Sequence, residues 1–389
     1  MRSTLAHEFI ATVRSVVGDE PVIGLHEPEI GEVEQAFVAE CLASTFVSSV
    51  GPFVTRFEQE IAAITGARHA IVVSNGTSAL HVALTLAGVR PGDEVLIPAL
   101  SFVATANAVV HAGARPFFVD GNPVTLGLDT VALEVVIGGF ERRDGVLVNP
   151  RTGSRVSAIV PMHTFGHPLD IRAIVALADE HGLVVVEDAA ESLGSYVGDR
   201  HTGTFGRLGV LSFNGNKIVT TGGGGMVLTD DDELGARAKH ITSTAKLPHP
   251  WEFEHDEVAW NYRMPNINAA LGVAQLTRFD GFLVEKRRLA DRYSAAFADL
   301  DGISFLPEPE GTTSNYWLNA VRLDVADLAL RDALLQASHD AGLKVRPFWN
   351  LLSDQRMYRE NERGDLSTAR ELLDSVICLP SSPRLARVP

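Results

Sequence analysis

The sequence has 389 residues, of which 46% are hydrophobic and 21% are charged, a composition that favours a compact protein with a large core over a disordered one. Its 49 acidic and 33 basic side chains give a net charge of -16, which argues against binding to nucleic acid or to an anionic membrane surface. The two cysteines, Cys41 and Cys378, lie in apolar stretches without metal-ligand spacing, so we expect neither a disulfide nor a metal site. Because we find no signal peptide and no apolar run of about 18 residues, we expect a cytoplasmic protein without a membrane span.

The first part of the chain alternates between helical and extended patterns. Residues 1–29 are polar and include the stretch HEPEIG, and we expect them to form an N-terminal arm. Apolar residues at helical spacing from Ile30 to Leu42 and from Phe53 to Ile64 predict two helices. Strands and helices then alternate in units of about 30 residues, beginning with the strand HAIVV at 69–73. This alternation predicts a mostly parallel central sheet covered by helices on both faces.

The pattern changes after a helix predicted at 231–245, which leaves the sheet. From Asn268 onward, two helical segments precede a strand, a helix and a short strand, which predicts a smaller α/β domain. We therefore expect a large domain at 30–255 and a small C-terminal domain at 256–389, with the boundary somewhere within 245–265.

Several chemically distinctive residues follow predicted strands, at the edge where open α/β sheets bind ligands. The turn Ser74-Asn75-Gly76-Thr77 could hold a phosphate, although serine and threonine are also ordinary helix caps. Phe102 could stack on a flat ring or belong to the core. Asp188 ends a buried strand, where an unpaired carboxylate is costly, so it either meets a partner such as a protonated pyridine nitrogen or caps the next helix.

Lys217 lies on a short turn between two apolar runs, shortly before the glycines Gly222–Gly225, and Ser212 precedes it as a second phosphate candidate. A lysine beside glycine-rich backbone suits Schiff-base chemistry with an aldehyde cofactor; the alternative is a solvated lysine in a flexible hairpin. The sequence contains neither the dinucleotide fingerprint nor the Walker phosphate loop, so nucleotide cofactors are not expected. The two histidines of HTFGH (163–167) lack the glutamate of a zincin motif, and we expect no metal there.

Five motifs occur along the chain in the order VSNGTSAL, SFVATAN, VVVEDAAES, SFNGNK and NYRMPNINAA. In this combination they resemble the sugar-nucleotide aminotransferases of the DegT/DnrJ/EryC1/StrS family, from about Gly24 to the C-terminus. The resemblance implies a pyridoxal 5'-phosphate-dependent transferase of fold type I that forms a homodimer with shared active sites. It implies that Lys217 forms the Schiff base with the cofactor, that Asp188 contacts the pyridine nitrogen and that Phe102 stacks on the ring. The other implied cofactor-binding residues are Gly76, Thr77 and Ser212 at the phosphate, Glu191, and Asn261 from the other subunit.

Similarity to one branch, the aminotransferases of legionaminic-acid and bacillosamine-type pathways, is carried by STFVSSVGPFV, TTGGGGM, TAKLPHPWEFEHDE and SNYWLNA. This similarity implies transfer of the amino group of L-glutamate to C4 of a nucleotide-linked 4-keto-6-deoxy-N-acetylhexosamine, with pyridoxamine 5'-phosphate as the intermediate cofactor form. The candidate substrate-binding residues are His163, Arg263, Tyr316 and Arg346. For Arg263 and Arg346 a salt bridge at the surface or between domains is an open alternative.

Glu191 departs from the wider family, in which glutamine is more usual. A carboxylate beside the phenolate oxygen of the cofactor would be repelled unless protonated, so we expect Glu191 to be neutral and to donate a hydrogen bond. Two other functions remain as alternatives. A dehydratase of the same fold would carry histidine in place of Lys217, and a non-catalytic cofactor-binding or regulatory protein would not need to retain both Lys217 and Asp188.

Overall fold

The computed structural model describes residues 2–388; Met1 and Pro389, at the ends of the predicted arm and small domain, lie outside this range. The fold is built around a seven-stranded sheet with the spatial order β1 (His69–Val73), β11 (Gly225–Thr229), β10 (Leu208–Ser212), β7 (Val184–Asp188), β6 (Val156–Ile159), β2 (Glu94–Pro98) and β3 (Arg115–Val119). Strands β10, β7, β6, β2 and β3 are parallel, whereas β11 is antiparallel to both β1 and β10. The mostly parallel sheet predicted from the sequence is therefore confirmed.

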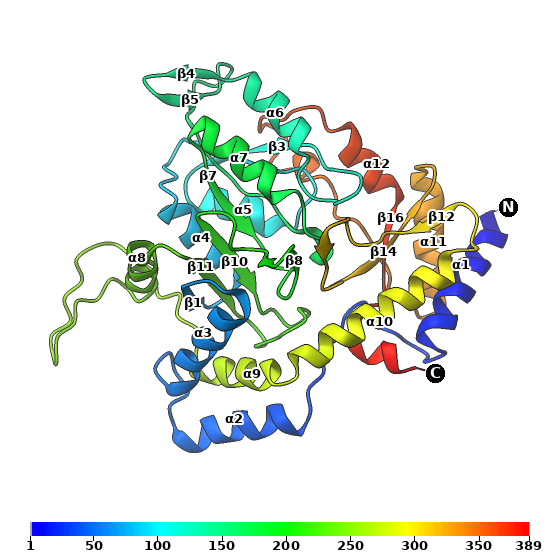
Figure 1. Ribbon diagram of the computed structural model, residues 1–389, viewed down its shortest axis with the longest axis horizontal. Helices are drawn as coiled ribbons and strands as arrows, with labels where there is room; N and C mark the ends of the chain where they lie inside the picture. Colours follow the sequence, from blue (N-terminus) through cyan, green and yellow to red (C-terminus); the bar gives the residue numbers. More distant parts are fainter. Residues whose placement is uncertain (1, 389) are drawn as a thin grey trace.

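Helices cover both faces of this sheet (Figure 1). Because successive residues of a strand point to opposite faces, Ile71 and Val73 enter one core while Ala70 and Val72 enter another. The first core contains α4 (Gly76–Leu86), α5 (Val103–His111) and α8 (Asp232–Thr242). The opposite face is covered by α3 (Pro52–Thr65), α9 (Asn266–Leu276), α6 (Thr130–Gly138) and α7 (Ile171–His181).

The C-terminal part of the chain forms a second, antiparallel sheet of four strands. Its order is β12 (Ile303–Phe305), β14 (Asn319–Leu323), β16 (Val376–Leu379) and β15 (Arg346–Pro347), and its helices are α10 (Phe279–Phe297), α11 (Leu328–Asp340) and α12 (Ser367–Ser375). Phe348, Leu372 and other side chains of this part belong to the same core as Ile71 and Val73. The two parts of the fold thus pack directly on each other, and the division at residue 255 stays a prediction.

The sequence predicts a polar arm at 1–29, whereas the structure has a helix, α1 (Arg2–Val17), in its first half. Phe9, Val13 and Val17 are fully buried and pack in one cluster with Leu289 and Tyr293 of α10. Figure 1 shows α1 beside α10, close to the C-terminus. The apolar residues Phe9, Val13 and Val17 recur at helical spacing, so the amphipathic pattern of α1 was present in the sequence, and its burial against α10 stabilises the helix.

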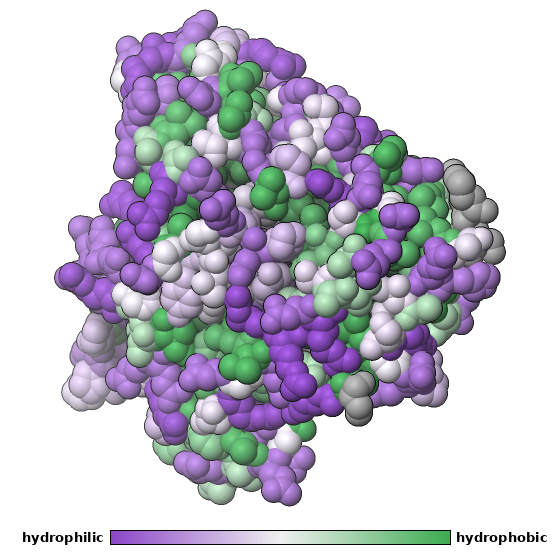
Figure 2. Space-filling model, turned by 45° about the vertical axis from the view of Figure 1, so that its right-hand side comes forward, coloured by the Kyte–Doolittle hydropathy of each residue, from purple (hydrophilic) through white to green (hydrophobic). Residues whose placement is uncertain are grey.

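The remaining elements complete the surface. They are α2 (Glu32–Ser44), the hairpin β4 (Glu141–Arg143) and β5 (Val146–Val148), the small sheet β13 (Thr312–Thr313), β8 (Tyr196–Val197) and β9 (Arg200–His201), and the 3-10 helices η1 (Thr164–Gly166), η2 (Leu352–Asp354) and η3 (Pro383–Arg387). On the face drawn in Figure 2, hydrophilic residues predominate and hydrophobic ones form small separate patches. Within residues 2–388, no helix is both long enough and apolar enough to cross a membrane.

Candidate functional site

A cavity of about 640 Å³ lies where the strands of the large sheet end and the C-terminal part of the chain packs on them. Its walls include Asn75–Thr77 after β1, Phe102 after β2, Asp188 at the end of β7 and Lys217 after β10. Residues 346–350 of the C-terminal part line it as well. The structure therefore brings together the four features that the sequence places after separate strands, as expected at the carboxyl edge of an α/β sheet.

The turn after β1 and the end of β10 form one corner of the cavity. The Asn75 side chain caps α4 by accepting a hydrogen bond from Ser78 N at 2.8 Å, and Gly76 and Thr77, the first residues of this helix, line the cavity. A Cβ atom added to Gly76 would lie 3.1 Å from Ser212 Cβ and 3.2 Å from Ser212 Oγ. Glycine thus lets the two turns approach closely, and this corner offers backbone N–H groups, a helix N-terminus and the hydroxyls of Thr77 and Ser212 to a phosphate.

Asp188 is buried in the wall of the cavity, and its carboxylate accepts two hydrogen bonds. Thr105 Oγ1 donates to Oδ2 at 2.8 Å, and Ala190 N donates to Oδ1 at 3.2 Å. Burial raises the pKa of Asp188, while these two hydrogen bonds and the positive charge of Lys217 oppose the rise. The carboxylate is therefore held in one orientation and shielded from solvent. A cationic partner inside the cavity would stabilise its charged form.

Lys217 enters the same cavity, with its side chain only 12% exposed. Its Nζ donates to Glu191 Oε1 at 3.1 Å and lies 3.7 Å from the centre of the Trp317 ring. The turn that carries it is closed by a hydrogen bond from Lys217 N to Asn214 O at 3.0 Å. The lysine side chain is therefore mostly buried in the cavity wall rather than solvated on an exposed hairpin.

Glu191 is buried beside Lys217 and accepts two hydrogen bonds, from Lys217 Nζ to Oε1 and from Phe165 N to Oε2 at 2.9 Å. Burial raises the pKa of Glu191 to about 7, against the opposing charge of Lys217 and the hydrogen bond from Phe165. The carboxyl group therefore exchanges between neutral and charged forms near neutral pH. The expectation that it is neutral beside a bound cofactor stays a prediction.

Two residues predicted to bind substrate lie outside the cavity. Tyr316 is buried, and its hydroxyl accepts a hydrogen bond from Glu308 N at 2.9 Å. His163 is fully buried, with Nε2 at 2.9 Å from Glu187 Oε2. The structure gives no support for substrate contact by either side chain, because both are enclosed by the protein interior.

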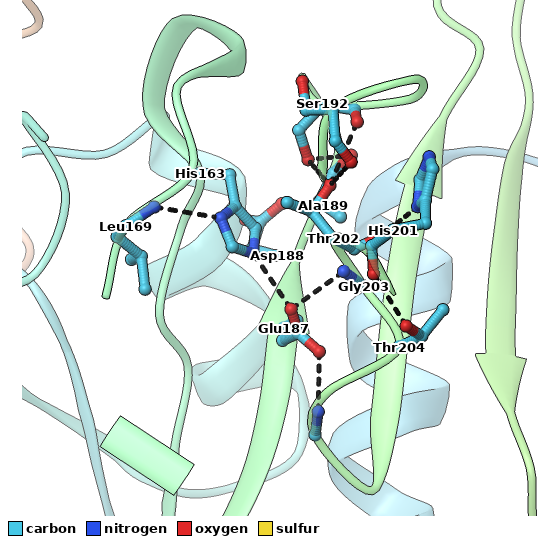
Figure 3. A network of polar contacts seen from close by, with 12 residues as sticks. His163, Leu169, Glu187, Asp188, Ala189, Ser192, His201, Thr202, Gly203 and Thr204 are labelled. Carbon is cyan, nitrogen blue, oxygen red and sulfur yellow. Dashed lines mark hydrogen bonds and ion pairs between the residues drawn. The ribbon is translucent and has the colours of Figure 1, made fainter. Parts of the chain in front are cut away.

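Figure 3 shows the network that holds His163. Its Nδ1 accepts from Leu169 N at 3.4 Å, so the ring donates from Nε2 to Glu187. Glu187 also accepts from Gly203 N at 2.8 Å and from Gly206 N at 2.6 Å. Glu187 and Asp188 are neighbours on β7 and point to opposite faces, so one carboxylate anchors the loop before β10 while the other faces the cavity.

The other predicted residues divide into two groups. Arg346 lines the cavity with an exposed side chain, and Phe102, 53% exposed, lines it with its ring centre 6.4 Å from that of Trp349. Asn261 and Arg263 lie away from this cavity, and Arg263 Nε donates to Asn261 Oδ1 at 3.1 Å. Their predicted place beside a second subunit stays untested by one chain.

Sequence reasoning missed two residues that the structure places at the site. Thr105 lies within the motif SFVATAN, four residues after Ser101, whose hydroxyl is 2.7 Å from that of Thr105. Trp317 lies within SNYWLNA, one hundred residues after the lysine that it contacts. Thr105 could have been placed near the site because it lies in the first turn of α5, just after Phe102, whereas no local pattern could pair Trp317 with Lys217.

Known proteins share this sequence and fold. A family model described as the DegT/DnrJ/EryC1/StrS aminotransferase family matches residues 28–388. The chain is 36% identical over 354 residues to GDP-perosamine synthase of Caulobacter vibrioides, covering 91% of each chain. It is 35% identical over 369 residues to EpsN of Bacillus subtilis, whose name places it provisionally among pyridoxal phosphate-dependent aminotransferases, covering 93% of this chain and 92% of EpsN. The crystal structure of the aminotransferase TlmJ from Streptoalloteichus hindustanus matches with a TM-score of 0.84 and 33% identity, over 92% of this chain and 93% of TlmJ.

Proposed function

The chain belongs to the DegT/DnrJ/EryC1/StrS aminotransferase family, and from this premise we propose that it transfers the amino group of L-glutamate to C4 of a nucleotide-linked 4-keto-6-deoxy sugar. It is a pyridoxal phosphate-dependent sugar aminotransferase with the α/β fold of that family. The observation that carries the proposal is the convergence of Lys217, Asp188 and the Gly76–Thr77 turn on one cavity.

Different residues of the cavity would contact the phosphate, the ring and the ring nitrogen of pyridoxal 5'-phosphate. The corner at Gly76, Thr77 and Ser212 would hold the phosphate, and the absence of a Cβ at position 76 lets Ser212 approach this turn closely. Phe102 would lie against the ring, with Asp188 at the pyridine nitrogen. When bound, the cofactor supplies an electron sink for the substrate carbon that gains or loses the amino group.

Asp188 would hold a proton on the pyridine nitrogen. Thr105 and Ala190 each donate a hydrogen bond to this carboxylate, which favours its charged form and fixes its direction. A buried carboxylate of this kind gains most from a cationic hydrogen-bond donor, and a protonated ring nitrogen is such a donor. The same geometry keeps water away from the pair, which strengthens the attraction.

Lys217 would have two tasks. Its Nζ would bond covalently to the cofactor aldehyde, and as a free amine it would move a proton to and from the substrate carbon. Glu191 contacts this amine directly and changes protonation near neutral pH, so it would adjust the charge beside Lys217. A dehydratase, which would carry histidine at this position, is disfavoured by the presence of lysine.

Substrate anions would be met by local positive charge, since the whole chain carries a net charge of -16. Among the cavity-lining residues within 2–388, positive charge comes from Lys217 and Arg346. Arg346 stands on the C-terminal part of the chain, opposite the lysine turn, and would bind the diphosphate of the sugar nucleotide or a carboxylate of glutamate. Arg263 would assist from a second subunit.

A homodimer with shared active sites is part of the proposal. Asn261 and Arg263 lie at the surface, away from the cavity of their own chain, where Asn261 would reach a partner's cofactor. Exposed apolar side chains also occur between α2 and α3, namely Phe46, Val47 and Val50. Burial of such side chains is the usual gain in subunit association. Light scattering of the purified chain tests this point.

The acceptor sugar has two candidate forms. Sequence stretches similar to legionaminic-acid and bacillosamine-type enzymes favour an N-acetylhexosamine, whereas relatives in Caulobacter vibrioides, Vibrio cholerae and Escherichia coli O157:H7, 34% to 36% identical, are named GDP-perosamine synthases. Assays with UDP-linked and GDP-linked 4-keto-6-deoxy sugars, with and without an acetamido group, separate the two. We expect glutamate-dependent formation of an amino sugar from one of them. Failure with every member of the panel, or loss of a hydroxyl without gain of nitrogen, would refute the proposal.

A further inference from the structure

The amine of Lys217 lies against the face of the Trp317 indole ring. Nζ lies 3.7 Å from the centre of the indole ring and 3.1 Å from Glu191 Oε1. Trp317 is 4% exposed, and both it and Lys217 line the cavity. An ammonium group held against a tryptophan face with little water nearby is attracted by the negative face of the ring, most strongly for this ring among the aromatic side chains.

Three hydrogen bonds fix Trp317, one made by its indole ring and two by its backbone. Its Nε1 donates to Asn216 O at 2.7 Å, which ties the ring to the residue before Lys217. Its backbone N donates to Asn315 Oδ1 at 2.8 Å, and its backbone O accepts from the fully buried Lys286 Nζ at 2.7 Å. These contacts hold the ring in place whether or not the lysine amine lies on it, so the face is preformed.

We propose that Trp317 is the docking face of the free Lys217 ammonium and thereby stabilises the states in which this lysine is not bonded to the cofactor. The inference rests on the proposed function. With pyridoxal phosphate bound, the Lys217 ammonium would first release a proton, for which Glu191 is an acceptor within hydrogen-bond distance. The neutral amine would then condense with the aldehyde carbon, forming one carbon–nitrogen double bond and releasing one water, so that no ammonium remains on the indole face. Pyridoxamine phosphate has no aldehyde, so Lys217 stays free and keeps its contact with Trp317, as it does in the cofactor-free chain.

If Trp317 has this role, removing its ring changes the affinities for the two cofactor forms in different ways. Removing the ring destabilises the cofactor-free chain and the pyridoxamine phosphate complex alike, so the affinity for pyridoxamine phosphate is unchanged by this contact. The pyridoxal phosphate complex loses nothing, so its affinity relative to the cofactor-free chain increases. A residue that only supports the cavity would instead weaken both cofactor forms together.

The test measures dissociation constants of pyridoxal phosphate and pyridoxamine phosphate with the cofactor-free chain, by equilibrium dialysis and absorbance. In Trp317→Leu, the dissociation constant of pyridoxal phosphate divided by that of pyridoxamine phosphate should fall by roughly 3- to 30-fold relative to wild type. This is the range expected for a cation over a tryptophan ring. Trp317→Phe keeps a weaker aromatic face and should give a smaller fall. Trp349→Leu is the matched control, because Trp349 lines the same cavity but packs on Phe102 and Phe165, and its ratio should stay at the wild-type value.

Each result decides the inference. An unchanged ratio in Trp317→Leu, beside a wild-type chain that binds both cofactor forms, would overturn the docking role and leave the proposed function intact. Should the leucine variant fail to fold, the phenylalanine variant decides in its place, with a ratio equal to wild type counting against the role. A wild-type chain that binds neither form would instead defeat the proposed function.

Discussion

Replacing Glu191 by glutamine removes the carboxyl group that accepts a hydrogen bond from Lys217 Nζ while keeping the size of the side chain. The carboxyl group is buried, with a pKa raised from 4.5 to about 7. Between these two pH values the folded chain retains a proton that the unfolded chain releases. The stabilisation from the neutral form is therefore fully present below pH 4.5 and is lost as the pH rises through 7.

The size of the effect follows from the raised pKa. At about 1.4 kcal/mol for each pH unit between the two values, the wild-type chain loses on the order of 3 kcal/mol of unfolding free energy from this group between pH 4.5 and pH 8. Glutamine does not titrate, so Glu191→Gln avoids that loss. Its altered hydrogen bonds to Lys217 and Phe165 add an offset that does not depend on the titration of residue 191.

Urea unfolding of both cofactor-free chains at a series of pH values measures this directly. We expect the free energy of unfolding of the variant to rise relative to wild type by about 3 kcal/mol from pH 4.5 to pH 8, with most of the rise below pH 7. A difference that is constant over this range, or that falls as the pH rises, would refute the raised pKa and with it the idea that Glu191 is neutral near pH 7.

Two further substitutions test the walls of the cavity. Thr105→Val removes the hydrogen-bond donor to Asp188 Oδ2 at nearly constant side-chain volume. It should raise the dissociation constant of pyridoxal phosphate by about tenfold. An unchanged dissociation constant would mean that this hydrogen bond does not support the charged carboxylate. Arg346→Met should raise KM for the sugar nucleotide by about tenfold or more with little change in kcat, and an unchanged KM in steady-state assays would assign Arg346 to the surface.

Local chemistry explains why much of the site could be predicted from the sequence. Asp188 and Lys217 each follow an apolar strand, and parallel strands bring their carboxyl ends to one edge, so strand order alone gathers them. Gly76 is recognisable as part of the polar turn Ser74-Asn75-Gly76-Thr77 between a strand and a helix, whereas its close approach to Ser212 joins distant segments and is seen only in the structure.

The parts that could not be predicted depend on contacts between distant segments. Trp317 meets Lys217 only because the C-terminal part of the chain packs across the sheet edge. His163 was named as a candidate substrate-binding residue, and in the structure it is buried against Glu187, 24 residues further along the chain, a pairing that no local pattern reveals. Helix α1 was missed although Phe9, Val13 and Val17 recur at helical spacing, and its stability comes from packing on the distant helix α10.

The covalent attachment of the cofactor is the central claim, and borohydride reduction followed by peptide mass spectrometry tests it most directly. We expect reduction of the chain saturated with pyridoxal phosphate to attach the phosphopyridoxyl group to Lys217, and the visible absorption band and the attachment to be absent from Lys217→Ala. Attachment to any of the other four lysines, or survival of the band in the alanine variant, would contradict the account.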